Sequence, residues 1–86
     1  MISRDELRQE VIKWANEIGV QFKEIQIRRM TRKWGSCSTK GRLTLNELLL
    51  NEPKEFRDHV IIHELLHLRY PNHGKMFKVM LNTYLS

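Results

Sequence analysis

The chain has 86 residues, of which 29% are charged, and a formal net charge of +5 at pH 7. This length predicts one domain over residues 1–86, and the single cysteine, Cys37, excludes an intrachain disulfide and is typical of a reducing compartment. No apolar run reaches transmembrane length and the N-terminus lacks a signal-peptide core, so we expect a cytoplasmic protein with no membrane partner.

The first predicted element is a helix from about Arg4 to Ile18. Ser3 and Glu6 have the spacing of a capping box, in which two otherwise unpaired backbone N–H groups are satisfied. Gly19 is a natural terminator at the other end of the helix. Between these signals, apolar residues recur at helical spacing and are expected to pack as core: Leu7, Val11, Trp14 and Ile18.

Residues 20–30 are rich in β-branched and aromatic side chains and predict a strand, with an irregularity near Lys23 and Glu24. Lys40-Gly41 is a turn signal, and a short strand over residues 43–45 follows it. Together these segments predict a small antiparallel sheet of two to three strands. The apolar run over residues 48–50 is either the tail of the last strand or a buried connection.

Positive charge is concentrated in residues 20–42, which carry seven basic residues against one glutamate. A basic surface of this kind can bind nucleic acid, and the alternative is a solvated hairpin face. Nucleic acid is therefore a candidate partner for the basic segment 28–42. Salt-sensitive DNA binding would support this if it were lost on neutralising four cations: Arg28, Arg29, Arg32 and Lys33.

Two further helices are predicted in the second half of the chain. Pro53 is tolerated in a first helical turn, and the helix over residues 54–69 has apolar residues almost all the way round, which predicts a buried element. Asn72 is the expected cap of a last helix over residues 74–84. The order of elements predicts the α+β class: an N-terminal helix, a small sheet, a buried central helix and a C-terminal helix.

The central helix carries the motif H-E-x-x-H over residues 63–67. Positions i and i+4 lie one above the other on a helix, so His63 and His67 can present their imidazoles to one metal ion. Two such nitrogens and a third ligand make a catalytic zinc site with an open position for water. Glu64 borders the same face, where it can take a proton from that water.

The third ligand is expected to be His73. His59 also lies on the histidine stripe, but it is eight residues from His67, about 12 Å along a helix, which is too far for one zinc. The third ligand must therefore come from chain that has turned back. Pro71 disfavours helical geometry at Tyr70, and this break lets His73 return to the metal. We expect His59 to be an ordinary helix histidine.

Four stretches of the chain resemble the YgjP-like metallopeptidase family. Residues 29–38 read R-M-T-R-K-W-G-S-C-S and residues 41–46 read G-R-L-T-L-N, which is similar to the W-G-S-C-S hairpin of that family. Residues 60–68 and 71–77 match its H-E-L-x-H and N-H-x-x-x-F blocks, in the family's order. The family is related in layout to the SprT-like and Wss-type zinc proteases.

This resemblance implies a zincin-like minimal core with zinc at His63, His67 and His73, and with Glu64 as the catalytic acid/base. Many family members carry a longer N-terminal portion, so this chain is either a catalytic core or a minimal member that needs a partner. The histidine spacing also equals that of metzincins. However, Tyr70 stands where metzincins have glycine and no Met-turn can be assigned, so a metzincin is not expected.

The expected activity is zinc-dependent peptide hydrolysis, in which zinc polarises the scissile carbonyl and lowers the pKa of its water while Glu64 transfers the proton to the leaving amine. Two alternatives remain open: a DNA-associated SprT-like protease that uses the basic segment 28–42, and a non-catalytic domain with a structural zinc.

The roles of several other residues near the motif stay open at this stage. Three are candidates for stabilising the oxyanion: Tyr70, Arg32 and His59. Trp34 is either a wall of the cleft or a core residue. Cys37 is expected to be a small packed residue, since as a fourth metal ligand it would close the site. An edge strand could hold an extended peptide substrate.

Overall fold

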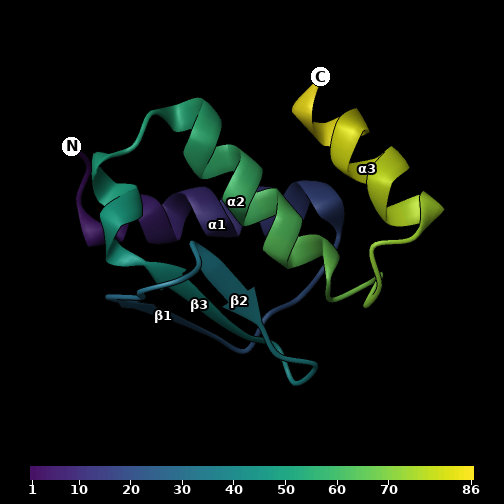
Figure 1. The fold of residues 1–86 in the computed structure, drawn as a ribbon, viewed down its shortest axis with the longest axis horizontal. Helices are drawn as coiled ribbons and strands as arrows, with labels where there is room; N and C mark the ends of the chain where they lie inside the picture. The colour runs from purple at the N-terminus through teal and green to yellow at the C-terminus, as the bar shows by residue number, and fades with distance from the viewer.

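Three helices and a three-stranded sheet make up the fold in the computed structural model, which describes residues 1–86 (Figure 1). The elements are α1 (Arg4–Ile18), β1 (Glu24–Arg28), β2 (Gly35–Cys37), β3 (Arg42–Asn46), the 3-10 helix η1 (Glu47–Asn51), α2 (Lys54–Leu66) and α3 (Lys75–Leu85). Helix α2 lies between the other parts and contacts α1, β2 and α3. The predicted α+β class is confirmed. None of the helices is long and apolar enough to span a membrane.

Helix α1 has the predicted bounds and the predicted caps. The Ser3 side chain accepts a hydrogen bond from the Glu6 backbone at 3.1 Å, and the Ser3 backbone donates to the Glu6 carboxylate at 3.2 Å. Gly19 ends the helix in the left-handed conformation with φ +79°, which other residues rarely adopt. The two ends of α1 are therefore fixed by signals that are local in sequence.

The sheet is mixed, so the expectation of a wholly antiparallel sheet is wrong. Strand β3 lies between the other two, antiparallel to β2 and parallel to β1, with Ile25 opposite Leu43 and Ile27 opposite Leu45. Residues 29–34 carry the chain from β1 to β2 on the far side of β3. Because β1 and β2 run in opposite directions, the strand between them must be parallel to one of them.

Several predicted boundaries shift in the structure. The strand expected over residues 20–30 is limited to β1, and the apolar run 48–50 lies in η1. Helix α2 ends at Leu66, and the next residues continue as a turn in which the Leu68 and Arg69 N–H groups bond three residues back. Asn72 is not the cap of α3, because that position is taken by Gly74.

A cluster of fourteen buried apolar residues forms the core, with contributions from all three helices and from β1 and β3. Helix α2 supplies five of them, as its apolar pattern predicts. It also buries Arg57, which donates to both carboxylate oxygens of Glu10 on α1 at 2.9 and 2.8 Å. This pairing compensates the burial of the charge and ties α2 to α1.

Asn46, at the end of β3, anchors the segment that leads into β2. Its side-chain amide donates to the backbone oxygens of Met30 and Lys33 at 3.0 and 2.9 Å, and its side-chain oxygen accepts from Leu48 N–H. Its backbone N–H donates to the Trp34 oxygen at 2.9 Å. Asn46 is only 4% exposed, so one buried side chain shapes the loop before β2.

Asn46→Ala is expected to lower the free energy of unfolding by about 2 kcal/mol, because it leaves partly buried backbone groups without partners. Chemical denaturation of both proteins measures this difference. Asn82→Ala is the matched control, since Asn82 is exposed and its side chain makes no hydrogen bond, and its effect is expected to stay within about 0.5 kcal/mol. Equal losses in the two variants would contradict the anchoring role.

Candidate metal centre

Three histidines converge at the end of α2. One ring nitrogen from each of His63, His67 and His73 lies within 4.8 Å of the other two. The Nε2 atoms of His67 and His73 are 2.9 Å apart, and the ring centroids of the three imidazoles are separated by 4.7 to 5.1 Å. The structure thus brings together the three side chains that the sequence selects as ligands.

Two features of the backbone produce this convergence. His63 lies on the last turn of α2 and His67 caps its C-terminus, so the two side chains are on one face. After His67 the chain turns, with the Tyr70 N–H donating to the Leu66 oxygen at 2.7 Å. Pro71 follows, and the reversal before α3 returns His73 to the end of α2. Figure 1 shows this connection between α2 and α3.

Phe77 on α3 forms the floor beneath the three imidazoles. Its ring centroid is 5.2, 4.8 and 4.7 Å from those of His63, His67 and His73. It is 3% exposed, so its packing limits the movement of all three rings. The apolar pattern of the last helix by itself predicts only that Phe77 packs in the core. Its position four residues after His73, in the N-H-x-x-x-F block, is the signal that could have indicated this role.

Glu64 lies beside the histidines with a side chain that is 12% exposed, and its Oε2 atom is 3.2 Å from Nδ1 of His63. Gly35 at the start of β2 permits this position. A Cβ on residue 35 would lie 3.1 Å from Cγ of Glu64 and 3.2 Å from the Thr44 backbone oxygen. The sequence contains Gly35 within its W-G-S-C-S stretch, but this close approach is visible only in three dimensions.

Electrostatics at the site favour neutral imidazole at His63. Burial lowers the pKa of His63 from its usual 6.5, although the neighbouring Glu64 carboxylate opposes this effect. Neutral imidazole is the form that binds metal. With Nδ1 of His63 facing Glu64, Nε2 is the nitrogen left for a ligand bond.

The donor set of the cluster fits a transition metal. Three imidazoles are typical of zinc, copper, iron or nickel, and they are three of the four ligands of a catalytic zinc site. No other cysteine, aspartate, glutamate or histidine belongs to the cluster. Three protein ligands leave a coordination position for water or substrate.

The remaining candidates from the sequence lie outside the histidine cluster. His59 is exposed on α2 and lines a cavity beside Trp34, while Arg32 is exposed on the loop before β2. Tyr70 is half-buried and packs against the core. Cys37 is half-buried on β2, and is not part of the metal-binding group. No contact in the structure selects one of the three oxyanion candidates.

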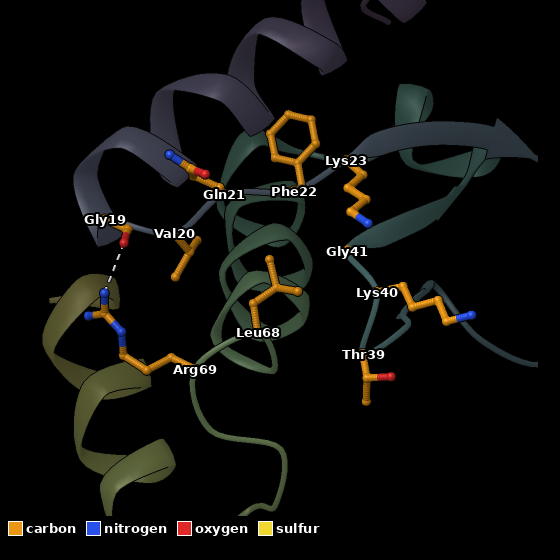
Figure 2. A pocket seen from close by; sticks show the side chains of 10 residues that line it. All are labelled: Gly19, Val20, Gln21, Phe22, Lys23, Thr39, Lys40, Gly41, Leu68 and Arg69. Atoms are coloured by element: carbon orange, nitrogen blue, oxygen red, sulfur yellow. Dashed lines mark hydrogen bonds between the residues drawn. The ribbon is translucent and has the colours of Figure 1, made fainter.

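The cavity shown in Figure 2 is distinct from the histidine site. It has a volume of about 520 Å³ and lies between the end of α1, the β2–β3 turn and the residues after α2. Arg69 reaches across it, and its Nη2 atom donates to the Gly19 oxygen at 2.9 Å. None of the predicted metal ligands or Glu64 lines this cavity, so its size does not make it the active site.

Comparison with known proteins supplies the family context. Residues 2–86 match the family model described as the YgjP-like metallopeptidase domain. Comparison with curated protein sequences gives no match.

Two solved structures have a similar fold. The metallopeptidase zymogen jannalysin of Methanocaldococcus jannaschii is 27% identical with a TM-score of 0.82, over 93% of this chain and 82% of that chain. The metallopeptidase zymogen abylysin of Pyrococcus abyssi is 25% identical with a TM-score of 0.78, over 88% of this chain and 76% of that chain. Both names describe metallopeptidases, in agreement with the family model.

Cys37 is expected to react slowly with alkylating reagents in the metal-free protein. Burial raises the pKa of its thiol from 9.0 to about 11, and the Glu64 charge adds to this rise. Because the thiolate is the nucleophile, the alkylation rate at pH 8 should be about one-hundredth of that of an unstructured cysteine peptide. The rate should increase as the pH rises toward 11.

Iodoacetamide labelling followed by mass spectrometry between pH 7 and 11 measures this rate. Glu64→Gln removes the neighbouring charge and is expected to speed the reaction at a given pH. Peptide-like labelling of folded protein at pH 8 would show that the thiol is not shielded in this way.

Proposed function

Because the chain belongs to the YgjP-like metallopeptidase family, we propose that it hydrolyses peptide bonds with a zinc ion bound by His63, His67 and His73. Glu64 is the proposed catalytic acid/base. The observation that carries the proposal is the convergence of three imidazoles, from two parts of the chain, beside a carboxylate that touches one of them.

Zinc is the proposed metal because of the ligand set. Zinc binds imidazole well, needs no redox partner, and in hydrolytic sites takes three protein ligands. When bound, zinc supplies a Lewis acid that polarises the scissile carbonyl and makes a water more acidic near neutral pH. Phe77 beneath the imidazoles would hold them in the orientation that this geometry requires.

Glu64 is suited to proton transfer by its position. Its carboxylate is held between His63 and the start of β2, where Gly35 leaves space for it. In the proposed reaction Glu64 accepts a proton from the attacking water and passes it to the departing amine. One carboxylate can serve both transfers because its side chain lies beside a proposed metal ligand and keeps some exposure to solvent.

The alternative of a purely structural zinc receives less support. A structural zinc site is closed by four protein ligands, and Cys37, the candidate for a fourth ligand, is not in the cluster. The nucleic-acid expectation for residues 28–42 stays a prediction. Arg28, Arg29, Arg32 and Lys33 are exposed and form no ion pair, whereas Arg42 pairs with Glu24.

Glu64→Gln is expected to retain the metal and lose peptidase activity. The amide keeps the shape of the side chain but cannot accept the proton, so a rate loss of at least about 100-fold is expected. Cleavage of a proteome-derived peptide mixture, followed by mass spectrometry, measures activity, and elemental analysis measures the metal.

Glu55→Gln is the matched control, because Glu55 is an exposed glutamate in the first turn of the same helix. It should leave cleavage and metal content unchanged. Wild-type rates in Glu64→Gln would exclude the acid/base role of this carboxylate.

A further inference from the structure

A cavity beside the histidine cluster has walls suited to a ligand. It has a volume of about 330 Å³ and lies between the start of β2 and residues 56–64 of α2. Such a volume is at the lower end of the roughly 300–1,000 Å³ typical of ligand pockets. Its lining includes two members of the proposed active site, His63 and Glu64, together with the aromatic residues Trp34 and Phe56.

The apolar wall of this cavity is aromatic. Trp34 and Phe56 meet edge to face, with ring centroids 4.9 Å apart at an interplanar angle of 80°. Phe56 packs against the core, but Trp34 does not belong to the core or to the apolar residues packed around it. Trp34 is 36% exposed. An exposed indole outside the core has surface available to cover an apolar ligand group.

The position of Trp34 is fixed before any ligand arrives. Asn46 holds the backbone oxygens of Met30 and Lys33 with its side chain, and the Trp34 oxygen with its own N–H. Gly35 is held against Glu64 and Thr44, so the chain on both sides of the indole is constrained. A preformed wall binds with a smaller loss of conformational entropy than a mobile one.

We propose that this cavity binds a large apolar or aromatic side chain of the peptide substrate, from a residue next to the scissile bond. This inference rests on the proposed function, since the occupant is taken to be part of the peptide under attack. His63 and Glu64 border both the cavity and the reacting groups, so one residue of a peptide can reach both. Trp34 and Phe56 are the specificity-determining residues, and Asn46 is a positioning residue.

The residues that line the cavity also indicate which substrate side chains it would prefer. Lys33 and His59 are exposed residues of the lining, and Glu64 is its one acidic residue. The apolar part of the lining is formed by Trp34, Phe56 and Val60, which offer no hydrogen-bond partner to a charged group other than the indole N–H. A carboxylate or ammonium side chain packed against this apolar part of the lining would lose hydration that these three residues do not replace, whereas leucine, methionine or phenylalanine would not.

A binding experiment tests the cavity without requiring catalysis. The chain has two tryptophans, and Trp14 is an internal control because its Nε1 atom donates to Asp58 at 3.0 Å, away from the cavity lining. The probes are the N-acetyl amides of phenylalanine, leucine, alanine and glutamate. In a ¹H–¹⁵N spectrum, the first two are expected to shift the Trp34 indole signal at lower concentration than the last two, and to leave that of Trp14 unchanged.

Cleavage of a proteome-derived peptide mixture gives the second measurement. The wild type is expected to favour a large apolar residue at one position adjacent to the cleaved bond by at least about tenfold over alanine. Trp34→Ala should reduce this ratio by about fivefold or more, and Trp34→Phe by less. Val79→Ala is the control, since Val79 is an exposed apolar residue on α3 outside the cavity.

The possible outcomes distinguish a failure of this inference from a failure of the proposed function. Selective binding of the apolar probes without any cleavage would support the cavity and contradict the peptidase proposal. Cleavage with no apolar preference, or a preference that Trp34→Ala leaves intact, would overturn the cavity inference while the peptidase proposal stands. Equal shifts of the Trp34 signal by all four probes, or no shift by any, would also overturn it.

Discussion

The placement of one buried helix determines the rest of this structure. Helix α2 buries five apolar residues and Arg57 and contacts α1, β2 and α3, while its other residues form a more exposed strip. That strip ends in His63 and Glu64, polar groups that are partly buried and need partners. The turn after His67 and the ring of Phe77 bring His73 to them. The stability of the core and the geometry of the site therefore depend on the same helix.

A second constraint connects the sheet to the site. Gly35 lets β2 approach Glu64 more closely than any side chain would allow, and Asn46 fixes the loop that leads into β2. These contacts also place Trp34 at the edge of the histidine site, where it forms a cavity wall with Phe56. The small sheet thus has a role beyond covering the core, since its edge shapes the space in which a substrate would lie.

Local signals predicted much of this arrangement. The capping box at Ser3, Gly19 and the i, i+4 histidines depend on residues near one another in sequence, and each has the expected geometry in the structure. The pairing of strands that are distant in sequence is harder to predict. Strand β1 is parallel to β3 because β3 inserts between β1 and β2, which are both earlier in the chain. The contact of Phe77 with the imidazoles is also not predictable from the sequence, because an apolar position on an amphipathic helix does not reveal its partner.

The most direct test of the central claim is the metal content of purified protein after incubation with zinc and removal of the excess. The wild type and His59→Ala are predicted to hold about one zinc per chain, because His59 lies outside the histidine cluster. His73→Ala is predicted to lose the zinc while retaining the helical content of the wild type. A wild type that binds no zinc, or a His73→Ala variant that binds it with unchanged stoichiometry and affinity, would contradict the three-histidine site.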